Sequence, residues 1–287
     1  MPGAAHSPRM SIRLLGIDLD GTLLDPGGQL QASVRDAVRR VRARGIEVVL
    51  CTGRRFRTAL PIARELDLAG PIVVSNGGLV KEIESAQTRH QNSLPSELYF
   101  ELLEAMREHG PPLVYIDGYH QGTDFLTERI DEAHPFQAEY LADHGEFCQI
   151  VPDLATDPPA RVVMMTTMAD VSALDTLRER VLDAFGDRLH THSLMNKNYR
   201  GHILEFFAPG TGKWNALQKI AAELGIENDE IAAVGDDTND VGMLEGAALG
   251  IAMGNAVPAA KEVAQLVVRS NAEGGAVEAL ERVLLGA

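Results

Sequence analysis

Two carboxylates, Asp18 and Asp20, stand where a short apolar run over residues 12–17 gives way to a turn-rich stretch. The run is typical of a buried strand, and ligands of open α/β sheets bind at the edge where such strands end. Residues two apart on a strand share a face, so the two carboxylates are expected to converge, with a cation relieving their repulsion. Gly21 lets the backbone turn close to a ligand, and Thr22 adds a hydroxyl. In isolation, the pair could equally be a solvated acidic turn.

Polar residues also follow three other apolar runs of the chain. The runs cover 46–50, 72–74 and 231–234, and the polar stretches cover 51–55, 75–78 and 235–240. A helix predicted over 31–44, with valines at helical spacing and Gly45 as its stop, makes the first two strands a βαβ unit. Such a unit implies a parallel sheet, in which all these strand ends share one edge.

This set of strand-end residues suits phosphate chemistry. A carboxylate such as Asp18 can attack phosphorus to give an aspartyl-phosphate, and a second carboxylic acid can protonate the leaving oxygen and later activate water. Thr52 and Lys213 can neutralise phosphoryl oxygens, while Asp18 and Asp236 can supply carboxylates to Mg²⁺. Singly, Thr52 could be a plain turn residue and Lys213 a solvated lysine. Asp236 and Asp240 could be a helix cap and a first-turn acid, but the joint occurrence favours catalysis.

Regular α/β alternation fills the first and last thirds of the chain and is interrupted between them. The predicted fold is therefore α/β, with a Rossmann-like parallel-sheet core over 11–83 and 208–287. An α+β insert occupies 84–207, and residues 1–10 are expected to be a loose, disordered tail. Further core helices are expected at 58–66, 213–224, 241–245 and 275–285, with strands at 249–252 and 266–268.

The insert has a less regular pattern than the core. Ser96 is expected to cap a helix through residue 109, and Asp170 to begin another. Strands are expected at 113–116, 161–167, 188–194 and 202–207. The stretch 84–93 is polar and turn-like, and 130–159 shows no periodicity.

Composition excludes several classes of function. Among 287 residues, 26 Lys and Arg face 41 Asp and Glu, a net charge of −15 that argues against nucleic acid or an anionic membrane as partner. Cys51 and Cys148 form no disulfide framework, which suits the cytoplasm, and no apolar run is as long as a membrane span. The first ten residues lack the apolar segment of a secretory signal. Neither zinc spacing nor a thiol nucleophile is indicated.

The ordered motifs resemble those of the haloacid dehalogenase superfamily. They are Asp18-Leu19-Asp20-Gly21-Thr22, Cys51-Thr52-Gly53-Arg54, Lys213, and Gly235-Asp236-Asp237-Thr238-Asn239-Asp240. Ser75-Asn76-Gly77-Gly78, the long insert and the stretch 270–275 resemble its Cof-type branch, which carries a C2 (type IIB) cap. Trp214 departs from the pattern, because relatives often have glycine after the lysine.

This resemblance implies a Mg²⁺-dependent phosphatase of small phosphomonoesters, with sugar phosphates as the leading class. It makes Asp18 the nucleophile and Asp20 the general acid/base, while Thr52 and Lys213 hold the phosphoryl group. The implied metal ligands are Asp18, the backbone carbonyl of Asp20, Asp236 and Asp240. The implied substrate-binding residues are Gly21, Thr22, Gly53, Arg54, Asn76, Asn239 and, in the cap that selects the substrate, Lys197 and Arg200.

Two alternatives remain open at this stage. A phosphomutase on the same scaffold would return an isomer instead of phosphate. A signalling receiver also holds an aspartyl-phosphate, but it does not need the insert or the acid/base Asp20. The expected partner is a small phosphorylated metabolite, and the chain is expected to be a monomer or a homodimer.

Overall fold

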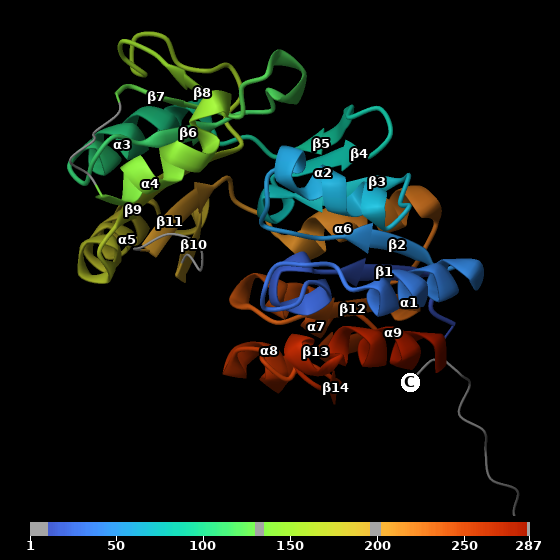
Figure 1. Ribbon diagram of the computed structural model, residues 1–287. Coiled ribbons are helices and arrows are strands. Elements are labelled where there is room, and N and C mark those ends of the chain that lie inside the picture. Colours follow the sequence, from blue (N-terminus) through green and yellow to red (C-terminus); the bar gives the residue numbers. More distant parts are fainter. Residues whose placement is uncertain (1–10, 130–134, 196–201, 286–287) are drawn as a thin grey trace, which may run out of the picture. The chain divides into compact units, whose positions relative to one another are not determined.

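The computed structural model describes residues 11–129, 135–195 and 202–285. The chain forms two compact units, shown in Figure 1. We call residues 1–89 and 212–287 the core and residues 90–211 the insert. The insert therefore begins and ends a few residues later in the chain than the sequence-based boundaries, which place it at 84–207. The predicted tail, 1–10, lies outside the described residues.

The core contains the predicted parallel sheet. Its five strands run in the order β14-β13-β12-β1-β2, and every paired neighbour is parallel. The strands are β1 (Leu14–Ile17), β2 (Glu47–Leu50), β12 (Ile231–Gly235), β13 (Leu249–Ala252) and β14 (Leu266–Val267). In β1, which pairs with a strand on each side, Ile17 lies opposite Leu50 of β2 and Val234 of β12. All of β1 is buried, as expected for a parallel strand covered on both faces.

A second sheet continues from the end of β2. It comprises β3 (Pro71–Val74), β4 (Leu79–Glu82) and β5 (Thr88–Gln91), with β3 antiparallel to β4. A parallel bridge between Cys51 and Val73 joins β3 to the polar end of β2. The sequence-based prediction of a turn over 84–93 was wrong for β5, because this polar, partly exposed strand shows no apolar alternation.

Helices flank the core sheet. They are α1 (Ala32–Ala43), α2 (Phe56–Glu65), α6 (Lys213–Leu224), α7 (Val241–Gly246), α8 (Pro258–Val263) and α9 (Gly275–Leu285). The buried face of α1 repeats at helical spacing, and α1 packs beside α9, as Figure 1 shows. Helix α6 ends at the left-handed Gly225, the expected stop, and packs against β3 and α7. The short helix α8 was not predicted.

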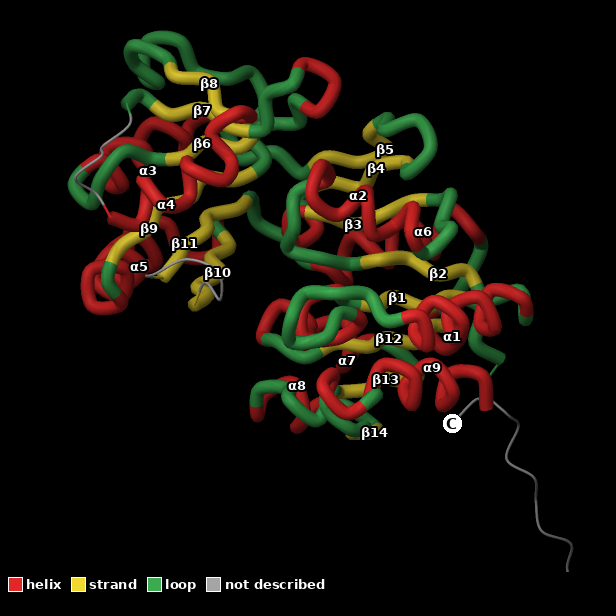
Figure 2. Tube along the Cα trace, in the orientation of Figure 1, coloured by secondary structure: helices red, strands yellow, loops and turns green. Residues whose placement is uncertain are grey.

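The insert is built on a sheet of its own, in the order β10-β11-β9-β6-β7-β8. Its strands are β6 (Leu113–Tyr115), β7 (Phe125–Thr127), β8 (Cys148–Ile150), β9 (Met164–Ala169), β10 (His190–Met195) and β11 (His202–Phe207). Its helices are α3 (Ser96–Arg107), α4 (Pro135–His144) and α5 (Val171–Phe185). Leu204 and Phe206 of β11 pack in one apolar cluster with α3 and α5, and Ile203 and Phe207 pack in another with α4. Alternate residues therefore cover both faces of this sheet (Figure 2).

Three predictions for the insert need correction. Ser96 is the first residue of α3, not its cap: Pro95 holds the cap position and no side chain caps the helix. The strand predicted at 161–167 is β9, shifted towards the C-terminus, because residues 161–163 precede the paired ladder. The stretch 130–159, for which no periodicity was found, contains all of α4 and all of β8. Prolines and histidines interrupt the apolar pattern there and concealed both elements.

No helix in the described part of the chain is both long enough and apolar enough to cross a membrane. This agrees with the hydropathy of the sequence.

Candidate active site

The loops that follow β1, β2, β3 and β12 are joined to one another by side-chain hydrogen bonds. Arg54 binds Asp20, Thr22 binds Asp236, and Asn239 binds Asn76. Since β1 pairs with both β2 and β12, the polar residues after these strands meet at one edge of the sheet. The polar rim predicted from the sequence is thus present in the core.

Lys213 is the centre of this rim, although it comes from a helix and not from a strand end. It is the first residue of α6, and only 1% of its side chain is exposed. Its Nζ donates hydrogen bonds to Oδ1 of Asp18, at 2.8 Å, and to Oδ1 of Asp240, at 2.7 Å. The solvated alternative for this lysine is therefore excluded.

The buried charges shift one another's ionisation. Burial opposes the charge of Lys213, but Asp18 and Asp240 nevertheless raise its pKa above the usual value. Burial also raises the pKa of Asp18, which Lys213 opposes and Asp240 and Asp236 reinforce. One ammonium group therefore faces more negative charge than it can neutralise, and the site favours a further cation.

The chemistry of the donor set fits a magnesium ion. Asp18, Asp236 and Asp240 are all buried, and one carboxylate oxygen of each lies within 4.8 Å of the others. Hard oxygen donors of this kind are what Mg²⁺ takes in proteins. Both oxygens of Asp236 are oriented by neighbours: Thr22 Oγ1 donates to Oδ1 at 3.0 Å and Asn255 Nδ2 to Oδ2 at 3.2 Å.

Asp240 is the most constrained of the three carboxylates. Its Oδ1 accepts from Lys213, and its Oδ2 accepts the backbone N–H groups of Asp236, at 2.9 Å, and Asp237, at 3.1 Å. These bonds explain its complete burial. The two bonds from backbone N–H groups also fix the conformation of the loop after β12, because Asp236 and Asp237 belong to that loop.

Asp20 does not join this group of three carboxylates. Its two oxygens accept a pair of hydrogen bonds from Nε and Nη2 of Arg54, both at 2.6 Å, and its side chain is 49% exposed. The convergence of Asp18 and Asp20 was expected from strand alternation, but Asp18 is still extended and the turn begins at Leu19, so alternation does not continue to Asp20.

The remaining predicted core residues line the same rim. Thr52 is buried, and its Oγ1 accepts the N–H of Arg54 at 3.1 Å, which leaves its hydroxyl proton for another partner. Asn76 has the left-handed φ of 54° that its short polar side chain tolerates, and its Oδ1 accepts from Asn239 at 2.8 Å. A methyl group at Gly53 would lie 3.0 Å from that same oxygen, so the glycine permits this close approach.

Two asparagines at the rim were missed from the sequence. Asn255, after β13, donates to the backbone carbonyl of Gly21 at 2.8 Å as well as to Asp236. Its own Oδ1 accepts the N–H of Asn271, whose side chain donates to the carbonyl of Leu24. Asn255 follows the end of β13, which pairs with β12, so it lies at the same edge of the sheet as the other polar residues. This position after a strand is the feature of the sequence that could have identified it.

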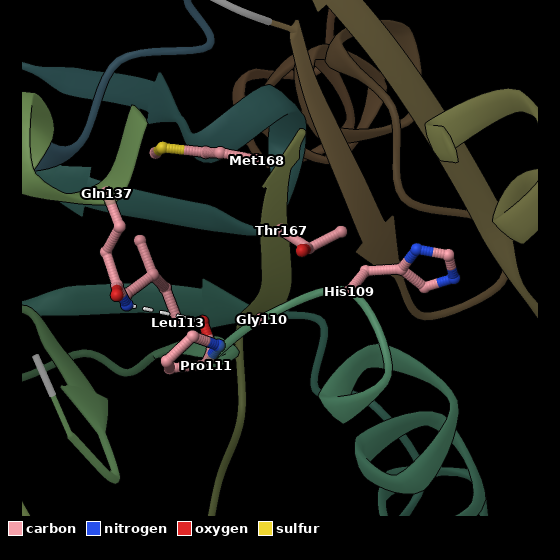
Figure 3. Close-up of a pocket in the computed structure, with 7 residues that line it drawn as sticks. All are labelled: His109, Gly110, Pro111, Leu113, Gln137, Thr167 and Met168. Carbon is pink, nitrogen blue, oxygen red and sulfur yellow. Dashed lines mark hydrogen bonds between the residues drawn. The ribbon is translucent and has the colours of Figure 1, made fainter. Parts of the chain in front are cut away.

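Two substrate-binding residues were predicted in the insert, Lys197 and Arg200, and both lie outside the described residues. Nδ1 of His192 on β10 lies 3.1 Å from Oε2 of Glu205, the residue directly opposite on β11, and both side chains are nearly buried. A small cavity in the insert, lined in part by Gln137 and Thr167, has a volume of about 10 Å³ (Figure 3). It has room for no more than a water molecule, so its size excludes a substrate site. Beside it, Gln137 Nε2 donates to the carbonyl of Pro111.

The comparisons with known proteins agree with one another. A family model described as haloacid dehalogenase-like hydrolase matches residues 15–280. The chain is similar to the 5-amino-6-(5-phospho-D-ribitylamino)uracil phosphatase YitU of Bacillus subtilis, with 27% identity over 275 residues, 93% of this chain and 96% of that protein. It is 30% identical over 275 residues to the chloroplast endoribonuclease YBEY of Arabidopsis thaliana, but spans 45% of that longer protein.

Solved structures show the same relationship. A haloacid dehalogenase-like hydrolase from Bacteroides thetaiotaomicron has a TM-score of 0.78 and 27% identity, covering 95% of this chain and 99% of that one. Another protein of that organism, the superfamily phosphatase BT1666, has a TM-score of 0.80 and 20% identity, covering 99% and 100%. The second likeness establishes the shared fold alone.

Gly21→Ala tests the close packing beside Asp236. Gly21 has a φ of +84°, and a methyl group there would lie 2.1 Å from Oδ2 of Asp236. Gly28 has a similar φ of +73° but nothing within 4 Å, so Gly28→Ala is a matched control for backbone strain. Gly28→Ala should lose roughly 1–2 kcal/mol of stability in thermal unfolding, and Gly21→Ala at least as much, because the clash adds to the backbone strain. Only Gly21→Ala should weaken Mg²⁺ binding, by at least about tenfold in calorimetric titration; equal affinities would contradict this account of the site.

Thiol labelling tests the exclusion of a cysteine nucleophile. Burial raises the pKa of Cys51, and it raises that of Cys148 to about 11. At pH 8 about one Cys148 in a thousand is then a thiolate, against roughly a quarter for an ordinary cysteine. Iodoacetamide should therefore label both thiols at least about 100-fold more slowly in the folded protein than in guanidinium chloride. Rapid native labelling of either residue, located by mass spectrometry, would show that the exclusion is wrong.

Proposed function

Because the chain belongs to the haloacid dehalogenase-like hydrolase family, we propose that it is a Mg²⁺-dependent phosphatase that works through an aspartyl-phosphate on Asp18. Membership confirms the Cof-type resemblance of the sequence motifs. The observation that carries the proposal is the buried Lys213, which binds Asp18 and Asp240 beside the third carboxylate, Asp236. This arrangement combines a nucleophile with the positive charge that phosphoryl transfer requires.

The proposed substrates are small phosphomonoesters, with phosphorylated sugars and sugar alcohols as the leading class. Support comes from three Bacillus subtilis relatives, 27% to 28% identical, that are named as phosphatases of a phosphoribitylamino-uracil. That compound carries its phosphate on a sugar-alcohol chain. We propose further that the insert, as the expected cap, selects the substrate and that the chain acts in the cytoplasm on a small metabolite.

In the first half-reaction, Asp18 would attack the phosphorus atom. Lys213 holds Oδ1 of Asp18, which leaves Oδ2 to form the new P–O bond. The bond between phosphorus and the ester oxygen breaks, and Asp20 gives its proton to that oxygen. Thr52 can donate its hydroxyl proton to the phosphoryl group, because its oxygen already accepts the N–H of Arg54.

In the second half-reaction, water would hydrolyse the aspartyl-phosphate. Asp20, now ionised, takes a proton from the attacking water, and the P–O bond to Asp18 breaks to restore its carboxylate. A Mg²⁺ ion bound by Asp18, Asp236, Asp240 and the carbonyl of Asp20 would supply additional neutralisation of the phosphoryl charge. Asn255 and Thr22 orient Asp236 for this task.

Arg54 has two roles in this scheme, one toward Asp20 and one toward the phosphoryl group of the substrate. In the structure it binds both oxygens of Asp20, and these bonds are strong because one partner is a carboxylate. Protonation of Asp20 removes that negative charge and so weakens the hold of Asp20 on Arg54. Its guanidinium group would then bind the phosphoryl group of the substrate, which is the role that the motif implies.

Substrate and metal dependence test the proposal most directly. We expect the protein to release phosphate from several sugar and sugar-alcohol phosphates with Mg²⁺, and to lose at least about 100-fold of this rate in EDTA, because Lys213 alone cannot balance the carboxylates and the substrate. Phosphate release and product structure should both be measured. Activity unaffected by EDTA would contradict the metal requirement, whereas isomer formation that needs a bisphosphate activator would identify a phosphomutase.

Asp18→Ala and Asp20→Asn separate the two carboxylates of the first motif. Asp18→Ala removes the nucleophile and should abolish turnover of every substrate. Asp20→Asn keeps the shape but exchanges no proton, so turnover of a sugar phosphate should fall by about 10²–10⁴-fold. With p-nitrophenyl phosphate, whose leaving group needs little protonation, a burst of about one nitrophenol per site should precede slow hydrolysis. Labelled phosphate trapped on Asp20, or an unchanged steady-state rate in Asp20→Asn, would show that these roles are wrong.

A further inference from the structure

Trp214, the residue after Lys213, packs directly on helix α7. A methyl group placed on Gly246 would lie 2.4 Å from Cε2 of the indole, which is too close for any real contact. One placed on Gly242 would lie 3.6 Å from Cβ of Trp214, an ordinary van der Waals distance. The indole therefore rests against the bare backbone at Gly246, and no side chain fits between them.

A second contact joins the same stretch of α6 to strand β1. Leu217 follows Trp214 by three residues, and its Cδ2 would lie 2.4 Å from a methyl group on Gly16 of β1. Helix α6 is thus held against β1 by Leu217 and against α7 by Trp214. Asp18 follows β1 directly and Asp240 immediately precedes α7, so each contact fixes α6 to an element that carries one of the two partners of Lys213.

We propose that Trp214 is a positioning residue for Lys213. Its packing on Gly246 sets the spacing of α6 and α7, and this spacing sets the 2.7 Å bond between Nζ of Lys213 and Asp240. Asp240 cannot follow a displaced lysine, because two backbone N–H groups hold its other oxygen. The inference rests on the proposed function, in which Lys213 holds the phosphoryl group, and misplacement of such a group by about 1 Å costs on the order of 10²-fold in rate.

Four variants of α6 and α7 test this contact, because they create, avoid or remove a clash between residue 246 and the indole of Trp214. Gly246→Ala should clash with the indole and lower kcat on p-nitrophenyl phosphate at least about tenfold. Gly242→Ala, the matched control on the same helix, should stay within about twofold, since alanine favours the helix and finds space there. Trp214→Gly should itself lose about tenfold in kcat. In the double variant, Gly246→Ala should cost nothing beyond Trp214→Gly, because the group with which it clashes is gone.

A stability control separates positioning from a general loss of packing. Val283 of α9 is buried and belongs to neither contact, so Val283→Ala leaves a cavity in the core without touching α6. Its melting temperature should fall while kcat, measured where all variants are folded by circular dichroism, stays within about twofold of wild type. Trp214→Gly assayed at the same temperature should still be impaired in kcat more than in KM.

Fluorescence gives a readout that does not depend on turnover. Trp214 is the only tryptophan among the 287 residues, so the emission reports on this indole alone. Gly246→Ala should displace the ring towards water and shift the emission to longer wavelength, whereas Gly242→Ala should leave it unchanged. If Gly246→Ala does not fold, Trp214→Gly with its Val283→Ala control decides the question.

Three results would overturn the inference. They are a folded Trp214→Gly enzyme with wild-type kcat, additive costs in the double variant, and an emission spectrum that Gly246→Ala leaves unmoved. A wild-type protein without phosphatase activity would instead refute the proposed function. The emission spectra would remain interpretable in that case, so the two failures can be told apart.

Discussion

The structure of the core depends on keeping one ammonium group, that of Lys213, buried among carboxylates. An ion in this environment is tolerated only when its partners are fixed and its hydrogen bonds are made, because removing either partner leaves an uncompensated charge out of water. Lys213 meets that condition through Asp18 and Asp240, which come from opposite ends of the chain. The same pairing that makes burial tolerable also aligns the nucleophile of the proposed reaction. Stability and chemistry therefore place the same demand on this residue.

The neighbouring loops fix the carboxylates of the site through further hydrogen bonds. Asp240 is fixed by backbone N–H groups, Asp236 is oriented by Thr22 and Asn255, and Asn255 is itself held by Asn271. The bonds to Asp236 and Asp240 satisfy buried carboxylate oxygens and fix their orientation, and the bond from Asn271 holds Asn255 in place. In contrast, the ion pair of Asp20 with Arg54 is partly exposed to solvent. The rim thus combines a rigid group of three carboxylates with an acid whose partner can be exchanged, a division that suits a residue that must both release and accept a proton.

The sequence was most informative where local pattern and tertiary role coincide. The bounds predicted for α6, β13 and α9 agree with the structure, because apolar spacing and flanking glycines mark them locally. The meeting of Asp18 and Asp236 was also predictable, since polar residues at the ends of neighbouring parallel strands lie at one edge, whereas Lys213 was expected there as the first residue of a helix. The expected convergence of Asp20 with Asp18 was wrong because a turn begins at Leu19, between them. Asn255 was missed because one asparagine after a strand resembles any turn residue. Strand β5 of the second sheet and helix α4 of the insert lack the periodicity on which such predictions depend. The structure of each is decided by the sheet or the apolar cluster that it joins.

The order of strands in the core sheet has a consequence for the synthesis of the protein. β1 pairs with β12, and Thr22 reaches Asp236 across 214 positions of sequence, so the sheet cannot close while the chain is still emerging from the ribosome at the insert. When the insert emerges, the nascent core contains β1 to β5, and the edge of β1 that will pair with β12 is unpaired. An unpaired apolar edge is prone to association with other chains. The insert, whose six strands pair among themselves, is able to fold in that interval. A chain released early would therefore carry a folded insert on an open sheet and would lack the carboxylates contributed by the loop after β12.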